Sequence, residues 1–214
     1  VSLYLTAAGI GHLGLVDDDV VEAANLQRQI LYDQSQLGKS KVEVARQKLL
    51  DLNPFIQVDA IPERFSAANA ESIAAGYDIL VDCTDHFSTR YLINDLCVLT
   101  RRPDVYGAVF RFEGQVSVFD ARQGSCYRCV FPEPPPPEFS PACMDAGVMG
   151  VVPGVIGSLQ AAEVIKIALG AGSPLYSRFM LFDALEETFQ ILQAPKRADC
   201  AICGSHPVIT TLQE

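Results

Sequence analysis

The sequence has 214 residues, of which 49% are hydrophobic and 20% are charged, values that predict a globular protein of one or two domains with a substantial core. The formal net charge of −10 argues against a nucleic-acid-binding face, because phosphate binding needs clustered Lys and Arg. We identify no apolar run of the roughly 20 residues that a membrane helix needs, and the start of the sequence lacks the charged lead-in of a signal peptide. We therefore expect a soluble, cytoplasmic protein that binds neither nucleic acid nor membrane.

Helices and strands alternate in the first half of the chain. Hydrophobic periodicity, Gly and Pro predict a helix end at 1–9, a buried strand at 11–17, a helix at 39–52, a strand at 56–61, a helix at 67–75, a strand at 78–82, a helix at 88–101 and a strand at 105–109. Two of these helices have apolar residues that we expect to be buried, namely Val42, Ala45, Leu49 and Leu52 in the first and Leu92, Leu96 and Leu99 in the second. This alternation predicts a parallel sheet with helices on both faces.

The second half of the chain has a different character. Strands are predicted in "GQVSVF" (114–119), "RFMLFDA" (178–184) and "TFQILQA" (188–194), the last two forming a hairpin around Leu185 and Glu186, with a helix at about 154–169. Six prolines precede Cys143 within 131–143, and because proline lacks an N–H this segment is predicted to be an extended loop. The expected fold is α/β and Rossmann-like, mostly parallel, followed by an antiparallel C-terminal part.

Polar residues gather after the strand at 11–17. Asp17 is the first acid after that strand, where nucleotide-binding sheets place a carboxylate that accepts hydrogen bonds from ribose. Arg28 and Lys41 follow, with Lys41 close to the start of a helix, a position that favours anions rather than cations. With Asn25 and Gln27 they make a donor cluster suited to a triphosphate. The alternatives are a solvated acidic loop and an ordinary surface lysine.

A second acidic position follows the strand at 78–82. In "VDCTDHF" Asp82 and Asp85 stand at the strand's carboxyl end, where one or two carboxylates suffice to hold Mg²⁺. Asp85 is the better metal candidate, because Asp82 could be buried and structural. Asp85 could also belong to the N-cap of the next helix. His86 is the neighbouring candidate for a nucleotide contact.

Seven cysteines include two CxxC pairs, Cys126 with Cys129 and Cys200 with Cys203. This spacing is typical of a Cys₄ zinc site, which would tie the C-terminal segment to the rest of the domain. A closed Cys₄ shell has no open coordination position, so we assign it a structural role. Cys143 stands apart after the proline-rich segment and is a conditional candidate for a nucleophile.

Seven segments together resemble the MoeB/ThiF family of ATP-dependent adenylyltransferases, which is related to ubiquitin-activating enzymes. They are "LVDDDVVEAANLQRQIL", "GKSKVEVA", "DILVDCTD", "YGAVFRFEGQVSVF", "CYRC", "GVIGSLQAAEVIK" and "CAIC". The resemblance runs over nearly the whole chain in the same order. It implies one adenylation domain at 1–214, with a nucleotide-binding half at 1–110 and a carrier-protein-binding and zinc half at 111–214.

The resemblance implies adenylation of the C-terminal glycine of a small ubiquitin-fold sulfur-carrier protein ending in Gly-Gly, with release of pyrophosphate. Carried over by position, Asp17 binds the ribose of ATP, and Asn25, Gln27, Arg28 and Lys41 bind the phosphates and their surroundings. Asp85 holds Mg²⁺. The four CxxC cysteines bind Zn²⁺, and Cys143 takes part in sulfur transfer in some members. A homodimer and a possible sulfurtransferase partner are also implied.

Two departures from the family accompany this resemblance. The family's first strand and its glycine-rich turn precede the segment that residues 1–9 resemble, so we expect the printed sequence to lack them, together with an arginine that reaches the partner's ATP; the fragment by itself could thus be inactive. The family usually has Asn where His86 stands, so we expect altered nucleotide contacts there. The carrier's pathway stays open among molybdopterin, thiamine, tRNA thiolation and cysteine synthesis.

Two other functions remain as alternatives. A nicotinamide-dependent oxidoreductase would also place an acid after the second strand, but it predicts neither the Arg28 and Lys41 cluster nor a Cys₄ site. A non-catalytic, zinc-containing interaction module predicts no nucleotide binding at all. Pyrophosphate exchange, compared with nicotinamide binding, distinguishes these functions.

Overall fold

The computed structural model describes residues 1–135 and 147–213. The chain divides into two compact units, Val1–Phe65 and Ser66–Glu214, and each is described by itself. The assignment of 1–110 to the nucleotide and of 111–214 to the carrier protein therefore stays a prediction.

The first unit is built on a parallel strand pair. Its elements are α1 (Ser2–Ala7), β1 (His12–Val16), the short 3₁₀ helices η1 (Ala23–Asn25) and η2 (Gln34–Gln36), α2 (Lys41–Leu52) and β2 (Gln57–Ile61). β1 pairs with β2 in parallel. The helix α2 packs on both strands, and its Leu49 is buried against Ile56 and Val58. The predicted helix, strand, helix, strand order of this unit is confirmed.

Two expectations about burial in this unit are wrong. The strand β1 is half-buried or exposed along its length, because within the unit only β2 flanks it. Leu52 is 50% exposed, since it is the last residue of α2 and lies at the edge of the apolar face that Val42, Ala45 and Leu49 bury.

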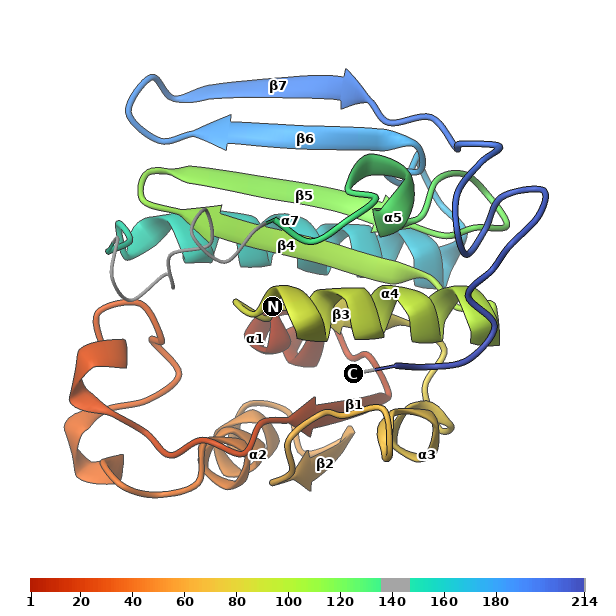
Figure 1. The fold of residues 1–214 in the computed structure, drawn as a ribbon. Helices are drawn as coiled ribbons and strands as arrows, with labels where there is room; N and C mark the ends of the chain where they lie inside the picture. Colours follow the sequence, from red (N-terminus) through yellow and green to blue (C-terminus); the bar gives the residue numbers. More distant parts are fainter. Residues whose placement is uncertain (136–146, 214) are drawn as a thin grey trace. The chain divides into compact units, whose positions relative to one another are not determined.

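The second unit contains a five-stranded sheet. Its elements are α3 (Ala70–Ala74), β3 (Leu80–Asp82), α4 (Phe87–Thr100), β4 (Asp104–Phe110), β5 (Glu113–Phe119), α5 (Tyr127–Val130), α7 (Val151–Leu169), β6 (Arg178–Asp183) and β7 (Thr188–Gln193). The strand order is β3-β4-β5-β6-β7, with β3 and β4 parallel and every later pair antiparallel (Figure 1). The predicted change to an antiparallel C-terminal part and the β6–β7 hairpin are confirmed.

Alternation along β4 assigns helices to the two faces of this sheet. A Cβ on Gly107 would meet the side chain of Gln160 in α7 at 2.3 Å, so α7 covers that face. The neighbouring Tyr106 points to the other face, where its ring lies 5.4 Å from the ring of Tyr127 in α5. Helices on both faces, as predicted, are therefore present within this unit.

Helix α4 buries more than its apolar residues. Leu92 and Leu96 are buried as expected, whereas Leu99 is 37% exposed. The buried face also contains Arg90, Asn94 and Asp95. Arg101 follows the helix in a left-handed conformation with φ of 58°, which ends α4 one residue before the predicted limit.

Helix α7 is long and apolar enough to cross a membrane by length and composition alone, with 39% of its most apolar window buried. In this unit it packs against β4 and β5. It also buries two polar side chains, Gln160 and Glu163. Gln160 donates to the carbonyl oxygens of Asp82 and Val105 at 2.8 and 3.0 Å, as expected of a core helix fitted to one particular sheet.

We predict that Gly107→Ala lowers the free energy of unfolding by about 1 to 3 kcal/mol, because the added methyl displaces the Gln160 amide from its two carbonyls. The matched control is Gly154→Ala in the exposed first turns of α7, where a Cβ meets nothing within 4 Å. This control should be neutral or stabilise by up to about 1 kcal/mol. Urea unfolding followed by circular dichroism measures both, and equal effects would contradict the packing described.

Candidate nucleotide and zinc sites

Lys41 is the first residue of α2, and its side chain is buried. The residue is 5% exposed, so the surface-lysine alternative is wrong. Its ammonium Nζ lies 2.7 Å from Asp19 Oδ2 and 3.8 Å from Asp17 Oδ2. The backbone N–H of Lys41 donates to the Asp19 carbonyl at 3.0 Å, and the Tyr32 hydroxyl donates to the Lys41 carbonyl at 3.2 Å. Burial, and then the charge of Asp17, raise the pKa of Tyr32 to about 12, so this hydroxyl keeps its proton.

The other predicted phosphate-binding residues follow β1 in the same unit. Asn25 is buried at the end of η1, and its Oδ1 accepts a hydrogen bond from Arg28 Nη2 at 2.9 Å. The structure thus brings Asn25 and Arg28 together and leaves Gln27 exposed. Asp17 is half-exposed, and its Oδ1 accepts from the Asp19 N–H at 2.8 Å. This contact folds the acidic loop around the lysine.

The two acids of "VDCTD", at the carboxyl end of β3, lie in different surroundings. Asp82 is 1% exposed, and its Oδ1 accepts from the Thr84 N–H at 2.8 Å and from the Thr84 hydroxyl at 2.7 Å. Burial raises the pKa of Asp82. Asp85, in contrast, presents a carboxylate whose side chain is 57% exposed, 3.7 Å from the exposed ring of His86. Asp82 is therefore structural, and Asp85 is free to meet a cation.

Two residues that the sequence did not single out support this strand end. Arg90 in α4 donates through Nη2 to the Thr84 carbonyl at 2.8 Å and through Nε at 3.3 Å. Asp104 begins β4 and is 1% exposed. Burial, reinforced by the charge of Asp82, raises the pKa of Asp104 well above its usual range. A charged residue in a helix or at the start of a strand normally indicates a solvated position, so only the buried surroundings identify Arg90 and Asp104.

The four CxxC cysteines meet in the second unit. The sulfurs of Cys126 and Cys129 are 3.8 Å apart, those of Cys126 and Cys200 are 3.6 Å apart, and those of Cys129 and Cys203 are 3.4 Å apart. All four lie within 4.8 Å of one another. Tetrahedral zinc with Zn–S bonds of about 2.3 Å requires sulfur separations of about 3.8 Å. The residues therefore fit a zinc ion with little rearrangement.

Helix α4 also positions one of the two CxxC segments. Asn94 Oδ1 accepts from the Tyr127 N–H at 2.7 Å, inside the CYRC segment. Arg128 of that segment makes two hydrogen bonds of 2.8 Å to the Asp95 carboxylate. Its guanidinium lies 4.6 Å from the centre of the Tyr91 ring. Because Asp95 is buried, this paired contact fixes the orientation of α5 and its cysteines.

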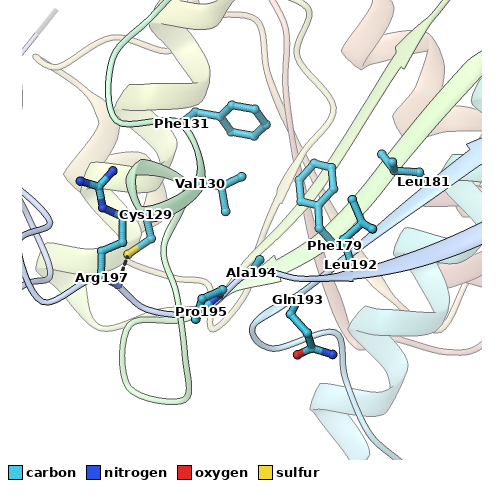
Figure 2. A pocket seen from close by; sticks show the side chains of 10 residues that line it. All are labelled: Cys129, Val130, Phe131, Phe179, Leu181, Leu192, Gln193, Ala194, Pro195 and Arg197. Carbon is cyan, nitrogen blue, oxygen red and sulfur yellow. Dashed lines mark hydrogen bonds between the residues drawn. The ribbon is translucent and has the colours of Figure 1, made fainter.

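An apolar cleft of about 420 Å³ opens beside the cysteine cluster. Its walls come from α5 and the residues after it, from β6 and β7, and from the segment Ala194–Arg197 (Figure 2). The rings of Phe131 and Phe179 pack edge to face with their centroids 5.8 Å apart, and Arg197 lies at the end near Cys129. The backbone N–H of Arg197 donates to Cys129 Sγ at 3.4 Å, so one wall of the cleft is attached to the cysteine cluster.

Cys143, the conditional nucleophile, lies outside the described residues. Its role in sulfur transfer stays a prediction. Most of the proline-rich segment that precedes it lies outside them as well.

Known proteins with similar sequences have adenylyltransferase names. The chain is 47% identical over 209 residues to a sulfur carrier protein adenylyltransferase of Thermus thermophilus, covering 95% of this chain and 77% of that protein. It is 48% identical over 212 residues to the adenylyltransferase and sulfurtransferase MOCS3 of Mus musculus, covering 99% of this chain and 46% of that protein. The chain thus spans about half the length of the MOCS3 relatives.

Solved structures of E. coli MccB have the same fold. The crystal structure of MccB with ATP matches with a TM-score of 0.79 at 25% identity, over 95% of this chain and 62% of that one. Another, of MccB with MccA-N7isoASN, matches with a TM-score of 0.80 at 24% identity, over 95% of this chain and 63% of that one. The ThiF family profile matches residues 1–202, and the chain belongs to the ThiF family.

Proposed function

We propose that this chain is the adenylation domain of an enzyme that uses ATP to adenylate the C-terminal glycine of a small sulfur-carrier protein. The observation that carries the proposal is the buried ammonium of Lys41 held beside Asp17 and Asp19 in a chain of the ThiF family. A buried lysine at a helix start is unfavourable unless anions surround it. We infer adenylyl transfer from the names of the two relatives that are 47 and 48% identical to this chain. We infer the sulfur-carrier substrate from the name of the first of them.

The chemistry needs charge and alignment rather than a general base. The terminal carboxylate of a carrier has a pKa of about 3.5 and is already ionised at neutral pH. Its obstacle is repulsion from the phosphates of ATP. We assign relief of that repulsion to Arg28 and Lys41, and binding of the ribose to Asp17, with Asn25 orienting the Arg28 guanidinium. Gln27 and His86 are exposed enough to add contacts to the nucleotide.

Asp85 is proposed to hold Mg²⁺ on the phosphates. When bound, the ion neutralises charge at the reacting phosphate and helps to align it. The support for this role is the exposed carboxylate at the end of a parallel strand, set next to a buried Asp82 whose Oδ1 is already engaged by Thr84.

The cysteine cluster is proposed to bind structural Zn²⁺. The ion, when bound, would join α5 to the C-terminal CxxC segment through four thiolates. The contacts between the sulfurs raise the pKa of Cys126 and lower that of Cys129, and zinc binding would require all four thiols to lose their protons. Because all four ligands are protein sulfurs, we assign no step of the reaction to this site.

The partners of the whole enzyme are part of the same proposal. We propose that the apolar cleft beside Phe131 and Phe179 binds the folded domain of the carrier protein. Homodimerisation is supported by the exposed apolar side chains of Met149 and Val151, 41 and 61% exposed, in the apolar run 147–156 at the start of α7. A sulfurtransferase partner, sulfur transfer through Cys143 and a cytoplasmic location complete the proposal by analogy with the named relatives.

Replacing Asp85 by Asn should lower carrier-dependent ATP–pyrophosphate exchange by about 100-fold or more, because one magnesium-binding oxygen and a full negative charge are lost. The assay uses the intact protein and a carrier ending in Gly-Gly. Asp78→Asn, at the opposite end of β3 and exposed, is the matched control and should retain normal exchange. Full exchange by the Asp85 variant, or exchange that persists with a carrier lacking its two glycines, would reject the proposed reaction.

Lys41→Gln should raise the KM for ATP and lower kcat, together reducing kcat/KM by roughly 10- to 100-fold, because the buried charge acts on the phosphates in a water-poor setting. The KM for the carrier should be unchanged. The control is Lys48→Gln on the same helix, whose ammonium pairs with exposed Asp33 at 2.9 Å. Equal loss in the two variants would point to general destabilisation of α2 instead.

Cys200→Ser should leave the protein without zinc and lower its thermal midpoint, because a three-thiolate site binds the ion more weakly and the C-terminal segment is freed. Zinc is measured by elemental analysis of the purified protein, with one ion per chain expected in the wild type. Cys97→Ala, which alters a buried cysteine outside the cluster, is expected to keep its zinc. A wild-type chain without zinc would overturn the assignment.

A further inference from the structure

We propose that Arg90 is a positioning residue for Asp85: it fixes the loop after β3, and with it the direction in which the Asp85 carboxylate meets the metal ion. This inference rests on the proposed role of Asp85. Arg90 itself is 8% exposed and buried within the second unit. It is therefore not a phosphate-binding arginine of the ordinary exposed kind.

The contact that carries the inference joins α4 to the strand end. Arg90 lies in the first turns of α4, and its side chain turns back so that Nη2 and Nε both donate to the Thr84 carbonyl, at 2.8 and 3.3 Å. Thr84 is the residue immediately before Asp85. Two donors on one carbonyl leave that peptide group little freedom to rotate.

The other side of Thr84 is fixed as firmly. Its N–H and hydroxyl both donate to Asp82 Oδ1, at 2.8 and 2.7 Å. Asp82 in turn ends β3, paired with Tyr106 of the parallel strand β4. The peptide before Asp85 is thus fixed from the strand by Asp82 and from the helix by Arg90, while the Asp85 side chain remains free for a ligand.

The surroundings suit arginine in particular. The guanidinium carbon lies 5.4 Å from the centre of the Phe87 ring and 5.6 Å from that of Tyr106, so aromatic rings flank the planar cation. Burial raises the pKa of the Asp82 and Asp104 carboxyls, and the nearby charge of Arg90 opposes that rise. A lysine would keep the charge but would lose the planar fork that serves both the carbonyl and the rings.

A purely structural role for Arg90, as a counter-charge to Asp82, makes a different prediction. Its loss would then lower stability without changing how the protein meets a divalent ion. If Arg90 instead positions Asp85, its loss should weaken metal binding at Asp85. Loss of a residue that orients a metal ligand typically has this effect. Metal binding therefore separates the two roles better than activity alone.

The test titrates Mn²⁺, as a probe for Mg²⁺, into the intact protein with less than one equivalent of ATP and no carrier, so that little free ATP competes for the ion, and follows free Mn²⁺ by electron paramagnetic resonance. Arg90→Gln should weaken Mn²⁺ binding roughly tenfold or more. Arg90→Lys should be intermediate. Thr84→Val, which removes only the hydroxyl contact with Asp82, provides a second variant that leaves Arg90 in place and should weaken binding by a smaller factor.

The matched control is Arg178→Gln. Arg178 also donates to main-chain carbonyls, those of Ser173 and Pro174, each at 2.8 Å, but it serves the start of β6. The Arg178→Gln variant should bind Mn²⁺ as tightly as the wild type. In exchange assays with carrier, the Arg90 and Thr84 variants should need more free Mg²⁺ for half-maximal rate, with an unaltered KM for the carrier.

The outcomes separate the inference from the proposed function. Unchanged Mn²⁺ binding in Arg90→Lys and Thr84→Val, alongside strong loss in Asp85→Asn, would overturn the positioning role and leave the proposed function standing. Unchanged Mn²⁺ binding and exchange in Asp85→Asn would overturn both. If Arg90→Gln fails to fold, the Arg90→Lys and Thr84→Val titrations decide the question by the same criterion.

Discussion

The second unit depends on one buried polar face of α4. Arg90, Asn94 and Asp95 are all 8% exposed or less, and each has a partner outside its own helix. Arg90 binds the Thr84 carbonyl, Asn94 accepts from the Tyr127 N–H, and Asp95 pairs with Arg128. Leaving a buried charge without its partner costs about 3 to 5 kcal/mol. The strand end before Asp85 and the CYRC segment must therefore keep their places against α4. One helix thus fixes both the carboxylate proposed to bind Mg²⁺ and half of the proposed zinc site.

One segment of the chain also connects the cysteine cluster to the apolar cleft. The segment after β7 first lines the cleft with Ala194 and Pro195 and then donates the Arg197 N–H to Cys129. Strand β7 is exposed along its whole length and forms the edge of the sheet. It therefore has few buried contacts of its own to hold the C-terminal segment in place. The proposed zinc site, by joining the second CxxC pair to α5, would supply the constraint that the edge strand does not. In this unit a metal site and a protein-binding surface would share a wall.

Much of this fold could be predicted from the sequence, because its elements follow simple periodicities. The alternation of strand and helix, the β6–β7 hairpin and the paired CxxC segments are all visible in the order of residue types. The polar face of α4 was not predictable, since Arg90 and Asp95 in a helix normally indicate a solvated surface, and only the tertiary partners reverse that expectation. Lys41 posed the same problem and left a surface lysine open as an alternative. Leu52 and Leu99 were expected to be buried and are instead exposed. Their spacing places each leucine on the apolar face of its helix, but it does not show how far the surface that covers this face extends.

If Lys41 binds the phosphates as proposed, its burial explains how the site can attract a triphosphate without a large positive surface. An exposed lysine loses up to about 2 kcal/mol of rotamer entropy when a ligand orders it. Asp17 and Asp19 already hold the Lys41 ammonium, and the contacts of its backbone with Asp19 and Tyr32 fix the start of α2. Most of that ordering is therefore complete before ATP arrives. Lys41 with Asp17 and Asp19 carries a net charge of −1, so a phosphate has to displace a carboxylate to reach the ammonium. A chain with a net charge of −10 can in this way bind phosphates through a few fixed cations, and its selectivity comes from placement rather than from total charge.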